Sequence, residues 1–295
     1  MRRPLFFLVA MLVSTAALAH GSHHRGNVSI SFDDWDESAV DCNALRVRFD
    51  DQRAVVVSED VPVAGLRSLT VRSEEHGGIR VIGWNGANYS VKACKAAALG
   101  DVSALRVSLN GNEVTATGPE DDRWVVYFIV RTPRNATLDL RSSNGPIGVQ
   151  EFNGTLTARA QNGPLSVKDS SGTIDATTVN GPISLSGGSG NVKLAATNGP
   201  LSVKLEGAAW EGGNLDATTQ NGPVSLKLPR GYRSGVVVEA LGHGPVSCRA
   251  EDCYSARMRA ADLDDDRPRR IELGTGTAAV HLSTVNGPVS VKDRD

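Results

Sequence analysis

The sequence is poor in aromatic residues, which make up 5% of its 295 positions, and it has almost no excess of charge of either sign. Its 31 basic residues are nearly matched by 33 acidic residues, so the formal net charge is −2. Nucleic-acid-binding proteins usually carry a basic excess or a basic stripe, and this balance therefore argues against a nucleic-acid partner. So few large rings also disfavour a wide globular core, whereas the 31 glycines indicate many turns.

Long apolar runs are missing from the sequence after its first residues. Met1–Arg3 is followed by an apolar run from Leu5 to Leu12 and by the small residues of Ala17–Ala19. This order is typical of a secretory signal peptide, which we assign to residues 1–19, and the run is too short to cross a bilayer. We expect an exported protein of the periplasm, cell surface or extracellular space, without a transmembrane segment after cleavage.

Cysteines are few, and their spacing does not match a zinc site. The sequence has four cysteines, which suit an oxidising compartment and allow three possible disulfide pairings. We favour Cys42–Cys94 and Cys248–Cys253, because each pair lies on one side of the central repeats. The sequence also lacks a Gly-x-Ser-x-Gly nucleophile elbow and a phosphate-binding loop. It therefore predicts no catalytic residue, no metal ligand and no cofactor.

What the sequence has in abundance is a repeated Asn-Gly-Pro segment followed by an alternating apolar and polar run. The copies begin at Asn144, Asn162, Asn180, Asn198, Asn221, His243 and Asn286. The first four are 18 residues apart, and the next steps are 23, 22 and 43 residues. A fixed period of this kind indicates stacked units that bury a core only together.

Each 18-residue unit has two halves, because glycines recur every nine residues from Gly145 to Gly199. Alternation of apolar and polar residues after each glycine predicts a half-buried strand. We expect glycine to supply a positive φ in each turn and proline to start the strand. The sequence thus predicts an all-β, single-stranded parallel β-solenoid with about 18 residues per coil. In it Val167, Leu185 and Val203 should form one interior column.

The less regular first part of the chain predicts a cap. We assign residues 20–27 to a flexible tail, 28–135 to irregular β coils and an N-terminal cap, and 136–295 to the regular solenoid with a loop insertion at 249–274. A cap is needed because a bare end coil exposes unpaired backbone groups. Large rings should pack in its core, at Trp35, Trp84, Trp124 and Phe128. A sugar-stacking site is the alternative role for these rings.

The repeat predicts columns of identical side chains. The turn asparagines should stack at one corner and hydrogen-bond along the solenoid axis. This structural ladder would contain Asn144, Asn162, Asn180, Asn198, Asn221 and Asn286.

Two outward rows should run along the face that follows the Asn-Gly-Pro turns. One is a hydroxyl row that includes Ser166, Ser202 and Ser225, and the other is a cationic row of Lys168, Lys204, Lys227, Arg249 and Lys292, with Ser186 as an interruption. A flat cationic row could lie against an anionic glycan or the envelope surface. The alternative is a solvated face on which lysines discourage aggregation.

The opposite face offers the only candidate pair of catalytic carboxylates. Asp139 and Asp175 should lie two coils apart, at about 9.6 Å, with Thr157 between them. That separation is near the upper limit for an inverting glycosidase. A polysaccharide-cleaving or carbohydrate-binding β-helix is therefore the alternative function.

The chain resembles the bacterial "putative adhesin" family of exported β-strand-repeat proteins. The resemblance is carried by Val130–Leu140 leading into Ser143–Ile147, by the alternating Asn-Gly and Gly-Thr turns, and by the return through Gly274–Gly276, Val280–Leu282 and Asn286–Gly287. It covers roughly residues 65 to 295. It implies a solenoid at the cell envelope with an adhesive or structural role, and it supplies no catalytic residues.

The sequence therefore favours a non-enzymatic, exported β-solenoid that serves as a structural or adhesive protein of the bacterial cell envelope. A regulatory partner of an envelope-stress system is a third hypothesis, which no residue pattern favours.

Overall fold

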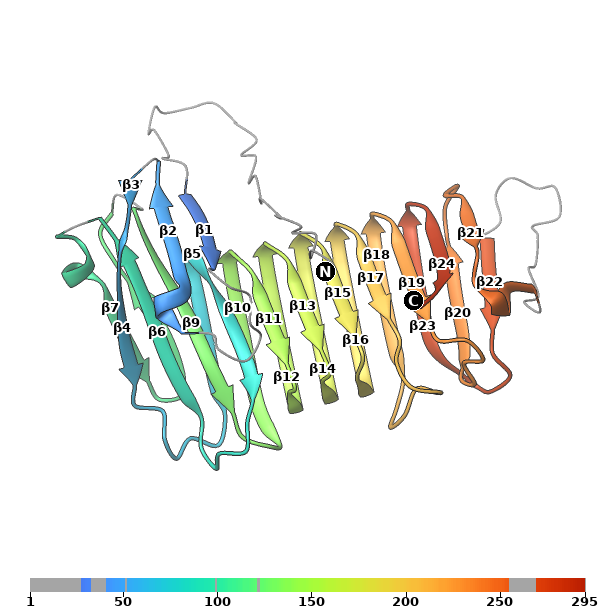
Figure 1. The fold of residues 1–295 in the computed structure, drawn as a ribbon, viewed down its shortest axis with the longest axis horizontal. Coiled ribbons are helices and arrows are strands. Elements are labelled where there is room, and N and C mark those ends of the chain that lie inside the picture. The colour runs from blue at the N-terminus through green and yellow to red at the C-terminus, as the bar shows by residue number, and fades with distance from the viewer. Residues whose placement is uncertain are drawn as a thin grey trace, which may run out of the picture.

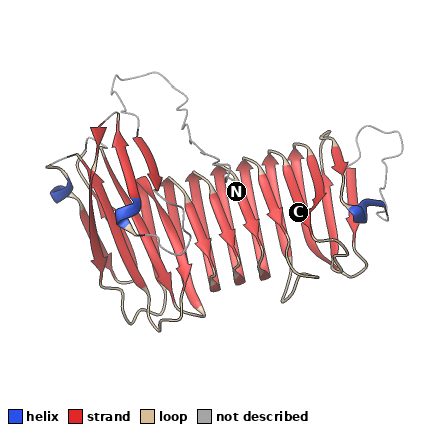
Figure 2. Cartoon of the chain, viewed as in Figure 1, coloured by secondary structure: helices blue, strands red, loops and turns tan. Residues whose placement is uncertain are grey.

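The computed structural model describes residues 28–32, 41–50, 52–98, 100–120, 123–254 and 269–294. The predicted signal peptide and tail lie outside these residues, as do Trp35 and residues 255–268 of the predicted loop insertion. The described chain is built from strands, with three short 3-10 helices (Figures 1 and 2). Within it, no helix has the length and apolar character needed to cross a membrane.

Two sheets face each other along an elongated molecule, and each coil contributes one strand to each sheet (Figure 1). The strands that follow the Asn-Gly-Pro corners form what we call the NGP sheet. Its repeat strands are β11 (Ile147–Gln150), β13 (Leu165–Lys168), β15 (Ile183–Ser186), β17 (Leu201–Lys204), β19 (Val224–Leu228), β24 (Val289–Asp293) and β21 (Val246–Cys248). The facing sheet contains β10 (Ala136–Asn144), β12 (Asn153–Asn162), β14 (Ser171–Asn180), β16 (Ser189–Asn198), β18 (Leu215–Asn221), β23 (Ala278–Asn286), β20 (Gly235–Ala240) and β22 (Arg269–Leu273).

The parallel solenoid is confirmed by the strand register. Val167 pairs with Leu185, and Leu185 pairs with Val203, in parallel strands. All three side chains are buried in the core between the two sheets. Because successive coils keep the same register, each apolar column continues through the repeats and buries its members against the coils on either side.

The glycines of the Asn-Gly-Pro corners are required for a reason that differs from the expected positive φ. Among the six, only Gly181 has a positive φ, at 158°, which is close to extended. A Cβ on Gly199 would lie 2.0 Å from the carbonyl oxygen of Gly181 in the preceding coil, and one on Gly163 would lie 2.2 Å from that of Gly145. The corner backbones therefore stack too closely for any side chain.

The coils do not stack in sequence order at the C-terminal end. β23 pairs with β18 on one side and with β20 on the other, and β24 likewise lies between β19 and β21. The last Asn-Gly-Pro copy, at Asn286, is therefore the spatial neighbour of the copy at Asn221. The copy at His243 lies one coil further out. This arrangement corrects the expectation that successive repeats always lie on top of one another.

The spatial order of the strands also differs from the sequence order at the N-terminal end. β5 (Leu69–Gly83) contributes to both sheets and pairs with β10 and β11 on one side. On its other side it pairs with β8 (Glu113–Thr117) and β9 (Trp124–Thr132), which come later in the sequence. Antiparallel strands then cover this end: β4 (Val55–Val61), β6 (Ser90–Ala97) and β7 (Arg106–Asn110).

A second, smaller core lies on the outer side of the cap. β1 (Val28–Phe32), β2 (Leu45–Phe49) and β3 (Gln52–Arg53) form a separate antiparallel sheet that packs on β6 and β9. Strand β9 is thus buried on both faces, which explains why its sequence does not alternate. Burial in this second core raises the pKa of Tyr127 to about 12.

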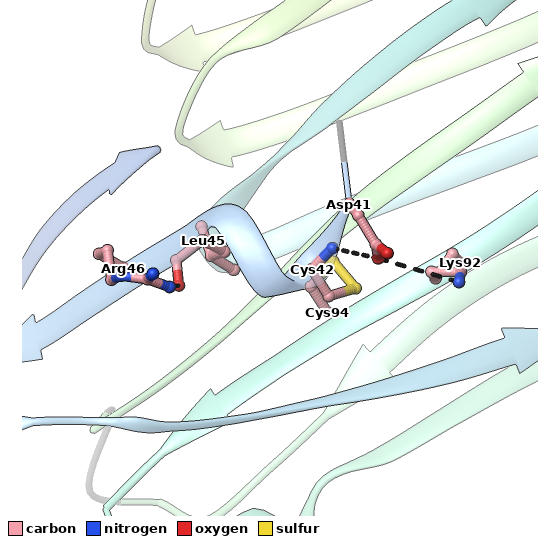
Figure 3. Close-up of a disulfide and its surroundings, with 6 residues drawn as sticks. All are labelled: Asp41, Cys42, Leu45, Arg46, Lys92 and Cys94. Atoms are coloured by element: carbon pink, nitrogen blue, oxygen red, sulfur yellow. Dashed lines mark hydrogen bonds and ion pairs between the residues drawn. A yellow bond between two sulfur atoms is a disulfide. The ribbon is translucent and has the colours of Figure 1, made fainter. Parts of the chain in front are cut away.

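A disulfide ties the small sheet to the solenoid. Cys42, in the 3-10 helix η1 (Cys42–Ala44), is bonded to Cys94 of β6, as favoured from the sequence (Figure 3). The carboxylate of Asp41 accepts a hydrogen bond from the Cys42 backbone N–H at 2.6 Å, and Lys92 Nζ lies 3.9 Å from it. A further 3-10 helix, η2 (Val102–Ala104), precedes β7.

The second favoured disulfide, Cys248–Cys253, is also confirmed, and it joins β21 to the 3-10 helix η3 (Glu251–Tyr254). The loop expected across residues 249–274 contains more structure than predicted. Strand β22, at Arg269–Leu273, pairs antiparallel with β20 and covers the last edge of the facing sheet. An irregular insertion therefore provides the C-terminal cap.

Candidate functional site

The outer face of the NGP sheet is the most regular polar surface of the described chain. In each strand the two apolar residues point into the core, so the residues that alternate with them point outward. Two rows of side chains point outward. The row nearer the Asn-Gly-Pro corners is, in spatial order, Ser166, Ser184, Ser202, Ser225, Ser290 and Ser247. The row beside it contains Lys168, Ser186, Lys204, Lys227, Lys292 and Arg249.

The last coil in the sequence, β23 and β24, lies inside the coil of β20 and β21. This exchanged coil order makes the cationic row continuous at the C-terminal end. Lys292 of β24 is in register with Lys227 of β19. Arg249 follows β21 on the far side of β24, with its backbone N–H bonded to the Val291 carbonyl at 2.8 Å. Four cations therefore occupy adjacent coils in the order Lys204, Lys227, Lys292, Arg249, which we call the cationic quartet. From the sequence alone Lys292 would have been placed last.

The cationic quartet has no carboxylate partner among the described residues. The nearby acidic groups are engaged elsewhere: Glu206 pairs with Arg294 at 3.0 Å, and Glu251 pairs with Arg230 at 3.1 Å. The carboxylate of Asp293 accepts the backbone N–H of Glu251 at 3.0 and 3.1 Å. Lys227, Lys292 and Arg249 are exposed, and Lys204 is half-buried.

Stacking like charges has an energetic cost. Neighbouring coils lie about 4.8 Å apart, and two unit charges at that distance repel by about 0.9 kcal/mol in water. Flexible side chains and salt reduce this repulsion. Negative charge placed along the row would offset this repulsion.

The remaining part of the row is less charged. Lys168 is separated from the quartet by Ser186, and its neighbour on the other side is Gln150. The Gln150 side-chain oxygen accepts a hydrogen bond from Arg80 at 2.9 Å. The predicted row of ligand-binding residues is thus divided into a continuous quartet and Lys168, which Ser186 separates from it.

The asparagine ladder runs along one edge of this face. Each Nδ2 group donates to the Oδ1 atom of the preceding asparagine in space at 2.9 to 3.0 Å, through Asn162, Asn180, Asn198, Asn221 and Asn286. The ladder is unbroken because Asn286 lies beside Asn221. Its amides already pair with each other, which fits the structural role expected from the sequence.

The facing sheet carries the two candidate carboxylates, and one of them is engaged in an ion pair. Asp139 and Asp175 lie two coils apart with Thr157 between them, in the predicted register. Both oxygens of Asp139 are occupied by Arg141, at 3.1 and 2.8 Å. This hydrogen-bonded pair raises the pKa of Arg141. Arg141 would have to release Asp139 before this carboxylate contacts a substrate.

A charged cluster that the sequence did not reveal lies at the C-terminal end of the facing sheet. His281 of β23 approaches Asp216 of β18 at 3.6 Å and Glu239 of β20 at 3.3 Å. Arg270 of β22 bonds Glu239 and, at 2.6 Å, Glu272. The cluster joins four strands that only the exchanged coil order brings together. His281 occupies the repeat position of Asp216, but nothing in the sequence indicated that Glu239 would lie beside it.

The described residues contain no group of three or more His, Cys, Asp or Glu side chains placed to hold a metal ion. Of the large rings predicted to fill the cap core, Trp124 and Phe128 are buried. Trp84 is not, because it lies in the turn after β5 and is 37% exposed. Core packing was therefore the wrong prediction for Trp84.

Comparison with known proteins finds similarity at the level of structure. Neither a protein-family model nor a curated protein matches the chain. A putative cell adhesion protein from Clostridium sporogenes is 10% identical, with 82% of this chain and all of that chain covered and a TM-score of 0.32. Putative adhesins from Bacteroides fragilis and Parabacteroides distasonis are 10% and 11% identical, each over 81% of this chain and 97% of theirs, with TM-scores of 0.27.

Proposed function

We propose that this protein is an exported, non-catalytic component of the bacterial cell envelope that binds an anionic polymer, such as an acidic glycan, along its NGP sheet. The observation that carries the proposal is the cationic quartet. It is continuous, it lies on a regular face, and it has no carboxylate partner among the described residues. The serine row beside it offers hydroxyl groups that can bond to sugar hydroxyls.

An exported location is supported by the two disulfides. Cys42–Cys94 and Cys248–Cys253 include all four cysteines of the sequence. Structural disulfides persist in oxidising compartments such as the periplasm or the cell exterior. An elongated coil stack is also a suitable scaffold, because each coil adds the same short length of binding surface.

Charge reversal tests the proposal. We expect the combined variant Lys204→Glu, Lys227→Glu and Lys292→Glu to bind immobilised polygalacturonate at least roughly tenfold more weakly, about 1.4 kcal/mol, at low ionic strength. Wild-type binding should weaken as salt is raised, because exposed charges are screened. Binding is measured by surface plasmon resonance against a neutral dextran surface.

A matched control changes the facing sheet by the same net charge. The variant Arg141→Glu, Arg159→Glu and Lys193→Glu alters three cations of the opposite face, and we expect it to retain most of the binding. Equal losses in both triple variants would mean that only net charge matters, and the proposal would fail. Undiminished binding by the first variant would identify the quartet as solvated surface.

A polysaccharide-cleaving enzyme is the alternative, and the ion pair between Asp139 and Arg141 counts against it. Turnover of polygalacturonate by the wild type that disappears in Asp139→Asn and Asp175→Asn would favour the alternative instead.

A further inference from the structure

The turn between β5 and β6 exposes a large ring. Trp84 is 37% exposed, whereas Trp124 and Trp210 are 6% and 7% exposed. A tryptophan side chain buries more apolar area than most other side chains when it is covered, so leaving one in solvent gives up a large favourable term. A ligand that covered the exposed part of the Trp84 ring would recover that part of the term.

The ring is held in place by its own turn. The indole Nε1–H donates to the Asn88 carbonyl at 3.1 Å, and the Trp84 backbone N–H donates to Thr132 at 3.0 Å. The ring also lies against Gly86, where a Cβ would come within 2.4 Å of the ring atoms Cε2 and Cζ2. A substituent at position 86 would displace the ring, so the orientation exists before any ligand arrives.

Neighbouring loops fix the turn further. Tyr89, which is buried, donates its hydroxyl to the Thr137 carbonyl at 3.0 Å and accepts the Thr137 N–H at 2.9 Å. The Asn88 side-chain oxygen accepts the backbone N–H of Gly65 at 3.3 Å. The hydrogen bonds of Tyr89 and Asn88 therefore close the turn without using the face of the indole ring.

Two polar side chains that suit a sugar belong to this part of the cap: Asn85, the next residue in the chain after Trp84, and Arg134, which is hydrogen-bonded to Asn85. Arg134 donates from Nη2 to the side-chain oxygen of Asn85 at 3.3 Å, and both residues are exposed. Arg134 has no ion pair within the part of the chain that the structure describes. An amide offers donors and an acceptor to hydroxyl groups, and a guanidinium offers paired donors to a carboxylate.

We propose that Trp84, Asn85 and Arg134 form a binding site for one sugar residue that carries a carboxylate. The apolar C–H face of the sugar ring stacks on the indole, and the carboxylate faces Arg134. Preformed sites combine an apolar surface with a few placed polar groups in this way. The site does not depend on the cationic quartet, so either can exist without the other.

The indole N–H resonances of the full-length, 15N-labelled protein test this proposal, with the Trp84 signal assigned from its loss in Trp84→Phe. We expect tetragalacturonate to shift the Trp84 signal while the signals of the buried Trp124 and Trp210 stay in place. Trp84→Leu should weaken binding at least roughly tenfold. Arg134→Met should abolish the preference for tetragalacturonate over neutral maltotetraose.

Two controls separate this site from other effects. Val57→Ser changes another exposed apolar residue of the cap and should leave binding unaltered. The triple glutamate variant of the quartet should still show the Trp84 shift, even if the proposed function fails. No shift with either sugar, or equal affinity in Trp84→Leu, would overturn the site. A shift with no difference between the sugars would overturn its acidic specificity.

Discussion

At the scale of single residues, the asparagine ladder shows how a repeat turns a weak interaction into a structural feature. Asn180 donates to Asn162 and accepts from Asn198, each at 2.9 Å. A solvent-exposed hydrogen bond between two side-chain amides contributes only about 1 kcal/mol to the free energy of unfolding. Each interior amide of the ladder bonds to the amides on either side, so the ladder aligns the coils that carry it along the axis.

We expect Asn180→Asp to break the ladder at neutral pH. The new carboxylate still accepts from Asn198, but it opposes an oxygen with the Oδ1 atom of Asn162 and loses that hydrogen bond. The free energy of unfolding should fall by about 1–3 kcal/mol. The folded state disfavours the charged form, which raises the pKa of the new carboxyl above its unfolded value of about 3.9.

The pH dependence gives this prediction its sign. The penalty is present above the raised pKa and is lost as pH falls below about 3.9, because the protonated carboxyl can donate to Asn162 again. Urea unfolding at neutral pH and at a pH below about 3.9 measures the difference in the free energy of unfolding. Asn135→Asp, in the turn between β9 and β10, is the control and should show no such change. Equal behaviour of the two variants would mean that the ladder adds nothing to stability.

At the scale of the strand and its turn, corner spacing explains why each Asn-Gly-Pro corner keeps its glycine. The carbonyl oxygens of the corner glycines occupy the place of a Cβ in the next coil. Interior hydroxyls complete the corners, since Thr219 donates to the Gly199 carbonyl at 2.9 Å and Thr284 to that of Gly222 at 2.8 Å. Parallel strands can keep their normal separation only if nothing larger than hydrogen stands at these positions.

This explanation predicts which of two glycine substitutions destabilises the protein more. Gly199→Ala should cost more than about 3 kcal/mol, because its Cβ would lie 2.0 Å from the Gly181 oxygen and two coils would have to separate. Gly207→Ala should cost about 1 kcal/mol, although Gly207 has a φ of +68°, because no atom lies within 4 Å of the added methyl group. Thermal unfolding of the two variants compares them directly. The reverse order would show that backbone conformation, and not spacing, selects glycine.

The strands that the sequence predicted well are those with one solvated face. From β10 to β19 the alternation of apolar and polar residues reports which side faces the core, so the register, the interior columns and the ladder could be derived. Strand β9 is buried on both faces by the small cap sheet, and it therefore shows no alternation to read.

The order in which the last coils stack in space could not be derived from the sequence. The steps of 22 and 43 residues between the last repeats fit sequential stacking as well as the observed exchange. The choice depends on β22, which pairs with the outer edge of β20, while β23 fills the gap between β18 and β20. The quartet, and the cluster around His281, follow from that exchange and were not predictable as continuous sites.

At the scale of the whole molecule, the solenoid should tolerate the removal of one complete coil. Residues 153 to 168 and 189 to 204 both pair with residues 171 to 186 in the same register. Deleting residues 171–188 would therefore bring Leu156 onto Val192 and Asn162 onto Asn198, and one shared interface would replace two. Stability in such repeat arrays is a sum over neighbouring units, so we expect a less stable but folded protein.

The deletion also changes the candidate site in a defined way. It removes Ser186, which separates Lys168 from the quartet, so five cations would occupy adjacent coils. We expect binding to polygalacturonate to strengthen several-fold at low ionic strength and to depend more steeply on salt. Deleting residues 153–170 is the control, since it shortens the solenoid equally but removes Lys168 and keeps Ser186 in place. Because a row that binds a polymer must respond to its own continuity, unchanged affinity in a folded 171–188 deletion would contradict the cationic face as the binding site.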